Sequence, residues 1–103
     1  MVETINVTEL ADLLHQDIQL IDVREPFEFN AAHIDGAVNL PLGDLAQWQT
    51  TLDRETTYYV ICRSGRRSQL ACEQLREAHF QAVNVAGGMI AWHDQGVDLH
   101  HAS

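Results

Sequence analysis

The strongest constraint on the fold is the regular alternation, along 103 residues, of short apolar segments with segments of helical spacing. The apolar segments, which we predict to be strands, are Thr4–Val7, Gln19–Val23, Ala37–Leu40, Tyr58–Ile61 and Phe80–Val85. Strands that alternate with helices are typical of an α/β fold, in which a mostly parallel sheet is flanked by helices on both faces. A chain of this length can bury one hydrophobic core and not two, so we predict a single domain over residues 1–103.

Helices are predicted between these strands, over Glu25–Ala32, Leu42–Leu52, Gln69–Ala78 and Met89–His93, with a further short helix around Leu10–Leu14. Thr8 is the predicted N-cap of the first helix, because its hydroxyl can accept a hydrogen bond from a first-turn amide. Apolar residues of these segments are predicted to face the core, namely Phe27, Phe29, Leu42, Leu45, Ala46, Trp48, Leu70, Ala71, Leu75, Ala78, Ile90 and Trp92.

The stretch from Tyr58 to Ser68 joins an apolar strand to a helix through a loop that carries charge. The strand stops at Cys62, five residues with three arginines and one glycine follow, and Ser68 opens the next helix. The amides of such a loop and of the first helical turn converge on one point, and the helix dipole adds positive potential there. A cysteine at that point is favoured as its thiolate, which is the nucleophilic form.

The charge distribution indicates that this loop binds an anion. The chain has fifteen Asp and Glu residues against six arginines and no lysine, and its net charge is -9. Three of the arginines, Arg63, Arg66 and Arg67, nevertheless lie within five residues of Cys62. The alternative is that Cys62 is a small buried residue ahead of an ordinary surface turn. The acidic balance of the whole chain predicts neither nucleic acid nor an anionic membrane as a partner.

Cysteine and histidine usage predicts neither a disulfide framework nor a metal site. Cys62 and Cys72 are the two cysteines, which suits a reducing cytoplasm. Cys72 either resolves an oxidised Cys62 or fills a gap beside the apolar face of its helix, and we favour the second role. His33 has no second His or Cys within five residues, so we predict a hydrogen-bonded structural histidine and no metal. Asp22, at the end of a strand, is predicted to accept hydrogen bonds from loop amides.

The first nine residues contain neither a basic segment nor an apolar segment of the kind that begins a secretory signal. No apolar run is long enough to cross a bilayer. We therefore expect a cytoplasmic protein without a membrane partner. His100 and His101 lie in a terminal segment that is predicted to fray.

Three separated stretches resemble the sequence signatures of the single-domain rhodaneses, a family of sulfurtransferases. The first is Ile21–Phe29 with Ala32–Pro41, the second is Cys62–Arg67, and the third is Val85–Trp92. Together they cover almost the whole chain and occur in the order found in the family. One departure is Ala32, where the family usually has glycine before the histidine, and we expect it to affect a turn and not the chemistry. The resemblance implies a rhodanese-like fold, with a five-stranded parallel sheet flanked by helices.

The resemblance also implies an activity, in which Cys62 takes a sulfane sulfur from a donor such as thiosulfate and becomes a persulfide. The sulfur then passes to cyanide or to a thiol acceptor, which can belong to another protein. The substrate-binding loop around the sulfur would consist of Arg63, Ser64, Gly65, Arg66 and Arg67. Neither a metal nor an organic cofactor is implied.

Two other functions fit the same loop. Phosphatases and arsenate reductases on this fold place five residues between their cysteine and arginine, whereas four separate Cys62 from Arg67, and Ser68 follows. The shorter loop suits a sulfur atom better than a tetrahedral phosphate, which disfavours that alternative. The other alternative is a non-catalytic binding module or sulfur carrier, although inactive rhodanese-like domains generally lack the loop cysteine.

Overall fold

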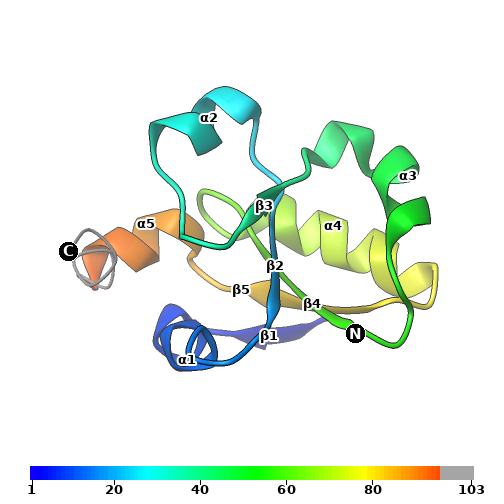
Figure 1. The fold of residues 1–103 in the computed structure, drawn as a ribbon, viewed down its shortest axis with the longest axis horizontal. Coiled ribbons are helices and arrows are strands. Elements are labelled where there is room, and N and C mark those ends of the chain that lie inside the picture. Colours follow the sequence, from blue (N-terminus) through cyan, green and yellow to red (C-terminus); the bar gives the residue numbers. More distant parts are fainter. Residues whose placement is uncertain (96–103) are drawn as a thin grey trace.

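Five strands form one sheet in the computed structural model, which describes residues 1–95 (Figure 1). The strands are β1 (Glu3–Ile5), β2 (Gln19–Asp22), β3 (Val38–Asn39), β4 (Thr57–Ile61) and β5 (Gln81–Val85), in the order β1-β5-β4-β2-β3. Every neighbouring pair is parallel. The prediction of an α/β fold with a five-stranded, mostly parallel sheet is therefore confirmed, with β4 at its centre. The prediction of a frayed segment at His100 and His101 lies outside the described residues.

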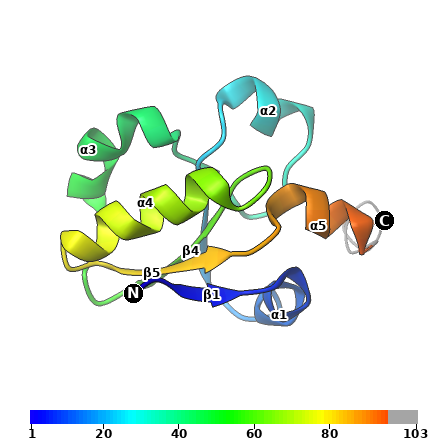
Figure 2. The same ribbon diagram turned by 180° about the vertical axis from the view of Figure 1, so that it is seen from behind.

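Helices cover both faces of the sheet, as predicted (Figures 1 and 2). On one face lie α3 (Leu45–Trp48) and α4 (Arg66–Glu77), and on the other lie α1 (Val7–Leu13) and α5 (Gly88–Asp94). The remaining helix, α2 (Pro26–Ala31), follows the end of β2 and contributes no buried residue. It stands apart from the two helical layers (Figure 1).

Two hydrophobic clusters, one on each face of the sheet, make up the core. The side chains of β4 alternate between them, since Tyr58 and Val60 join the cluster beneath α3 and α4, whereas Ile61 joins the cluster beneath α1 and α5. Cys62 continues this alternation and belongs to the first cluster. Its side chain therefore points toward the face of the sheet that α4 covers.

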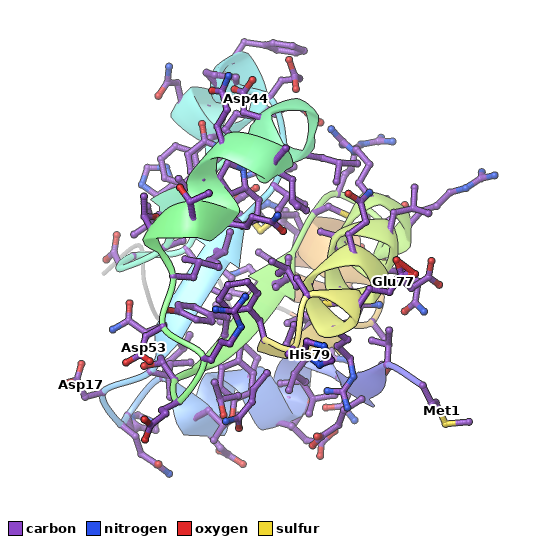
Figure 3. All side chains as sticks on the ribbon, turned by 90° about the vertical axis from the view of Figure 1, so that its right-hand side faces the viewer. Met1, Asp17, Asp44, Asp53, Glu77 and His79 are labelled. Carbon is purple, nitrogen blue, oxygen red and sulfur yellow. The ribbon has the colours of Figure 1, made fainter. Side chains whose placement is uncertain are left out.

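The segments that lead into the strands gather at one edge of the sheet, which faces the viewer in Figure 3. Asp17 precedes β2, Asp53 precedes β4 and His79 precedes β5, and all three side chains lie at that edge. The carboxyl ends of the strands, together with the loop after β4, lie at the opposite edge. Parallel sheets of α/β proteins form their ligand sites at the carboxyl edge.

The first helix is capped by a different residue from the one predicted. β1 stops at Ile5, and Asn6 is the N-cap of α1 in place of Thr8. The Asn6 side chain accepts a hydrogen bond from the Glu9 amide at 2.8 Å, and the Glu9 carboxylate accepts one from the Asn6 amide at 3.0 Å. This reciprocal arrangement satisfies two free amides at once, which explains why the helix begins here.

The helix predicted over Leu42–Leu52 is interrupted. Short 3₁₀ turns precede and follow α3, over Leu42–Asp44 and Gln49–Thr51. The hydroxyl of Thr51 donates to the Trp48 carbonyl at 2.7 Å. A side-chain hydrogen bond of this kind competes with the regular helical ladder, so α3 ends at Trp48.

Several residues do not face the side that was predicted for them. Phe27, Leu70 and Ile90 are exposed by 74%, 47% and 42%, and Ala46 is exposed as well. Cys72, predicted to lie beside the apolar face of its helix, is fully buried within that face. The residues that α4 buries are spaced at i, i+3, i+4 and i+7, and they are Ser68, Ala71, Cys72 and Leu75.

Candidate active site

The loop after β4 lies at the carboxyl edge of the sheet, where it passes between α2 and α5 (Figure 2). The structure places Cys62 directly after the strand and leaves Arg63 and Ser64 exposed. α4 begins at Arg66, three residues earlier than the predicted start, and Gly65 is its N-cap. Gly65 has a left-handed φ of 98°, which lets the chain turn directly from the loop into the helix.

The Cys62 sulfur is fully buried and receives hydrogen bonds from the loop and from α4. The Gly65 amide donates to Sγ at 3.0 Å, and the Ser68 hydroxyl oxygen lies 3.3 Å from it. Burial raises the pKa of the Cys62 thiol, but hydrogen bonds from the Ser68 hydroxyl and from the amides of Ser68, Gly65 and Ser64 outweigh that effect, so the pKa is lowered. The site thus stabilises a thiolate, which is the form that attacks sulfur.

The first turn of α5 holds the loop through backbone hydrogen bonds. The amides of Met89 and Ile90 donate to the carbonyls of Cys62 and Arg63, at 2.8 and 3.0 Å. In a trans peptide the carbonyl and the following amide point in opposite directions. The bond to the Arg63 carbonyl therefore turns the Ser64 amide away from α5 and toward the sulfur, where it helps to lower the pKa of Cys62.

Glycine at position 88 makes the close approach of α5 possible. Gly88 has a left-handed φ of 54°, and a Cβ there would lie 2.4 Å from the Cys62 carbonyl oxygen and 2.6 Å from that of Arg63. Any side chain would push α5 away from the loop. The third matching stretch, Val85–Trp92, contains this glycine, and the contact supplies the physical reason for it.

Arg67 is held by α2, because both of its terminal nitrogens donate to the Glu28 carboxylate, at 2.7 and 2.9 Å. The hydrogen bonds from Arg67 lower the pKa of Glu28 to about 2, against the opposing effect of burial. The Arg67 charge also interacts with the Cys62 thiolate. Arg67 thus ties α2 to the loop and adds positive potential near the sulfur, and it does not extend freely toward a substrate.

We expect this ion pair to make the folded state sensitive to acid. The pKa of Glu28 is lower in the folded protein than its ordinary value of 4.5, so its contribution to the free energy of unfolding is present above pH 4.5 and is lost as the pH falls toward about 2. Glu28→Gln should remove that part of the pH dependence and, because the pair is partly exposed, destabilise the protein at neutral pH by at most about 1 kcal/mol.

Urea unfolding of both proteins between pH 2 and pH 7 measures this effect. Glu77 is an exposed glutamate without an ion pair among residues 1–95, so Glu77→Gln is the matched control and should keep the wild-type pH dependence. If the free energy of unfolding falls equally with decreasing pH in wild type and in Glu28→Gln, the role given to the ion pair is wrong.

Arg63 and Arg66 are the loop arginines left for an anion. Both are exposed, and neither forms an ion pair with another residue in the described part of the chain. An open pocket of about 450 Å³ begins beside Arg63 and is bounded by α2 and α5. Its apolar wall includes Ala31 and Ile90. The predicted substrate-binding arginines therefore divide into one structural residue, Arg67, and two that face solvent.

A buried ion pair fixes the segment between β2 and α2. Arg24 donates to both carboxylate oxygens of Asp22, at 2.8 to 3.1 Å, and to the Ala32 carbonyl at 2.7 Å. Asp22 also accepts a bond from the Arg24 backbone amide at 3.0 Å, as predicted. Ala32 has an extended φ of -167°, which any residue adopts, so the departure from glycine introduces no backbone strain. His33 is the predicted structural histidine, since its Nδ1 hydrogen-bonds to the Phe29 carbonyl at 2.8 Å and the two rings stack.

The site also contains two polar residues that the sequence analysis does not assign to it. Ser68 is buried in the first turn of α4, where its hydroxyl lies within hydrogen-bond distance of Cys62 Sγ and of Asn84 Oδ1. Asn84 comes from β5. An amide side chain among the apolar residues at the carboxyl end of this strand is a signal for Asn84. The signal for Ser68 appears only once the helix is known to start at Arg66, because that start turns Ser68 toward the core.

Cys72 is buried in the core cluster beneath α4. Burial raises the pKa of its thiol to about 12, so it remains protonated at neutral pH. A resolving cysteine has to attack as a thiolate, and the environment of Cys72 opposes that form. The structure therefore favours the predicted gap-filling role.

Within residues 1–95, no group of three or more His, Cys, Asp or Glu side chains is arranged to hold a metal ion. The same part of the chain contains no helix of the length and apolarity that crossing a membrane requires.

Comparisons with known proteins identify the family to which this fold and this loop are similar. A sequence model of the rhodanese-like domain family matches residues 6–95. The putative sulfurtransferase YtwF of Bacillus subtilis is 46% identical over 77 residues, which are 75% of this chain and 75% of YtwF. The thiosulfate sulfurtransferase GlpE of Shewanella oneidensis is 35% identical over 92 residues, which cover 87% of this chain and 91% of GlpE. The putative sulfur carrier protein YrkF of Bacillus subtilis is 38% identical over 75% of this chain, but the match spans only 42% of YrkF.

A solved structure gives the same result for the fold. The crystal structure of a rhodanese-like domain protein from Staphylococcus aureus matches with a TM-score of 0.85 and 31% sequence identity. The match covers 88% of this chain and 91% of that protein.

Proposed function

This chain belongs to the rhodanese-like domain family, and from that membership we propose that it is a sulfurtransferase that works through a persulfide on Cys62. The donor is thiosulfate or a similar small anion, and the acceptor is cyanide or a thiol. The observation that supports the proposal is the environment of Cys62. Its sulfur is buried and accepts hydrogen bonds from the loop and from α4, and the pKa of its thiol is lowered. The proposed reaction uses neither a metal nor an organic cofactor.

In the first half-reaction the Cys62 thiolate attacks the outer sulfur of thiosulfate. A bond forms between Sγ and that sulfur, the sulfur–sulfur bond of thiosulfate breaks, and the bonding electron pair leaves with sulfite. The thiolate and the thiosulfate dianion thus become a persulfide anion and a sulfite dianion, so charge is conserved. Arg63 and Arg66 are exposed and supply positive charge for the donor and the leaving group.

In the second half-reaction an acceptor thiolate or cyanide attacks the outer sulfur of the persulfide. The bond from Sγ to the outer sulfur breaks, and its electron pair returns to Cys62 as the thiolate, which gives double-displacement kinetics. Fixed amides such as that of Gly65 stabilise the sulfur anion without reorganisation. The acceptor attacks the outer sulfur and not Sγ, because only that attack releases Cys62 as the thiolate.

The names of two relatives bear on the donor and the acceptor. GlpE is named as a thiosulfate sulfurtransferase, which supports thiosulfate as the donor here. YrkF is named as a putative sulfur carrier protein, which supports a protein thiol as an acceptor besides cyanide and small thiols. A reducing compartment such as the cytoplasm keeps Cys62 and Cys72 as free thiols, and we propose that location.

The phosphatase and arsenate reductase alternative has less support. Four residues separate Cys62 from Arg67, one fewer than in those enzymes. Arg67 also forms a bidentate ion pair with Glu28, so its guanidinium is not available for bidentate binding of a phosphate. A purely non-catalytic module is disfavoured because Cys62 is present and its pKa is lowered.

Intact-mass measurement of the reduced protein after incubation with thiosulfate tests the proposal. We expect a gain of one sulfur atom that dithiothreitol removes, and we expect cyanide to return the original mass while thiocyanate appears. Absence of the added sulfur, combined with hydrolysis of an aryl phosphate, would reverse the choice in favour of a phosphatase.

A further inference from the structure

Asn84 reaches the Cys62 sulfur through one intervening side chain. Its Oδ1 lies 2.5 Å from the hydroxyl oxygen of Ser68, and that oxygen lies 3.3 Å from Sγ. Cys62 and Ser68 are fully buried, and Asn84 is only 5% exposed. Solvent therefore offers these three groups no alternative partner, and their hydrogen bonds come from one another and from neighbouring protein groups.

The orientation of the Asn84 amide is fixed by its own neighbours. Its Nδ2 donates to the Gly65 carbonyl at 3.3 Å and to Gln69 Oε1 at 3.1 Å. Gln69 is oriented in turn, because its Nε2 donates to the Glu73 carboxylate at 3.2 Å. The nitrogen of the Asn84 amide thus faces two acceptors, and Oδ1 is the atom left to face Ser68.

Ser68 cannot donate to both of its neighbours at once. A serine hydroxyl carries one proton, and both Asn84 Oδ1 and a Cys62 thiolate are acceptors. A charged sulfur draws that proton to itself, because hydrogen bonds to charged groups are the stronger ones. When Sγ carries no charge, the proton returns to Asn84. Asn84 and the sulfur therefore compete for the Ser68 proton.

We propose that Asn84 is a positioning residue that acts through Ser68 to favour the persulfide over the free thiolate. When the bond from Sγ to the outer sulfur forms, the negative charge moves to the outer sulfur, and the Ser68 hydroxyl turns back to Asn84. The Ser68–Asn84 hydrogen bond is then recovered in the loaded protein. No atom passes between Ser68 and Asn84 in this step. The part of the proposal that concerns the persulfide rests on the proposed function.

Other ionisable groups around the sulfur are not altered by the variants used in the test. Arg67 keeps its ion pair with Glu28, and Arg24 keeps its pair with Asp22. Cys72 stays protonated, since its pKa is about 12. The remaining charged or titratable side chains on the loop, α4 and α5 near the site are Arg63, Arg66, Glu73, His93 and Asp94.

The pKa of Cys62, followed through the ultraviolet absorbance of the thiolate, separates competition from a structural role. Ser68→Ala should raise the pKa and lower the thiolate fraction at neutral pH by about tenfold, because a hydrogen bond to the charged sulfur is lost. Asn84→Leu should lower the pKa, because the Ser68 proton is then free for the sulfur. In a protein that already carries Ser68→Ala, Asn84→Leu should leave the pKa unchanged.

A purely structural role for Asn84 predicts the opposite sign. If Asn84 only holds the loop through the Gly65 carbonyl, Asn84→Leu raises the pKa of Cys62 whether or not Ser68 is present, and the proposal is wrong. The Gly65 carbonyl still accepts a hydrogen bond from the Gln69 amide at 3.2 Å in the variant, so no buried carbonyl is left without a partner. Asn84→Ala removes the same acceptor and gives the same comparison should the leucine variant fail to fold.

The chain offers a matched control for the loss of a hydroxyl–amide pair. Thr57 on β4 donates to Gln81 Oε1 on β5 at 3.2 Å, at the end of the sheet where these two strands begin. Thr57→Ala should leave the pKa of Cys62 unchanged. A shift equal to that of Ser68→Ala would mean that the measurement reports general loosening, and it would overturn the proposal.

The persulfide itself gives the second readout. At a fixed ratio of thiosulfate to sulfite, Asn84→Leu should lower the ratio of loaded to free protein by roughly threefold or more. An unchanged ratio contradicts the proposal. If wild-type protein takes up no sulfur, it is the proposed function that fails, and the pKa measurements still decide whether Asn84 and Sγ compete for the Ser68 proton.

Discussion

Replacing Cys62 with serine should abolish persulfide formation and lower the rate of sulfur transfer by about 10⁴-fold or more. The serine hydroxyl is close to the thiol in size but does not ionise near neutral pH. The donors from Gly65 and Ser68 then have no negative charge to stabilise. Thiocyanate formation from thiosulfate and cyanide measures the rate, and intact mass measures the loading.

Cys72 provides the matched control for this substitution. It is as deeply buried as Cys62, but burial raises its pKa to about 12, whereas the pKa of Cys62 is lowered. Cys72→Ala should retain full loading and should reduce stability only by about 1 kcal/mol, through the loss of a small buried group. Loading that survives in Cys62→Ser and disappears in Cys72→Ala would show that Cys72 is the nucleophile and overturn the proposed mechanism.

Gly88→Ala should lower the free energy of unfolding by about 2 to 4 kcal/mol, the largest effect on stability that we expect from a single added methyl group here. The new Cβ would lie 2.4 Å from the Cys62 carbonyl oxygen, and alanine would have to adopt a φ of 54°. Relief of this contact requires α5 to move away from the loop. The hydrogen bonds from Met89 and Ile90 then lengthen, and the loop amides lose their alignment on the sulfur.

Urea unfolding and the pKa of Cys62 together test this expectation. Gly43→Ala is the control, because Gly43 has no neighbouring atom within 4 Å of an added Cβ and its φ is not in the left-handed region. That variant should stay within about 0.5 kcal/mol of wild type. Equal stability losses in the two variants would show that α5 does not press on the loop as closely as the structure indicates.

The parts of the fold that follow from local pattern could be predicted from the sequence. Apolar runs with turn residues at their ends predicted all five strands, and the strand–loop–helix pattern placed Cys62 at the carboxyl edge of the central strand. The cluster of arginines indicated an anion site for the same reason, since the residues are adjacent in sequence. None of these inferences depends on which distant segment of the chain packs against the strand or the loop.

The parts that failed depend on a distant partner or on backbone conformation. The partner of Arg67 is Glu28, 39 residues away, so nothing near the loop shows that one arginine is already engaged. Ser68 faces the sulfur only because the left-handed Gly65 starts α4 early. Phe27 has the spacing of a core residue, but no element within residues 1–95 covers the outer side of α2, and the spacing of apolar residues does not show whether another element packs there.

Because α2 has no buried residue, it belongs to the site of this small domain but not to its hydrophobic core. α2 borders the open pocket beside the loop, and it is attached to the sulfur site through the Glu28–Arg67 pair, yet neither hydrophobic cluster relies on it. Substitutions on its outer face therefore change the surface beside the site without reducing the packing of the core. The surface beside the site can in this way be altered, by evolution or by design, through one short helix.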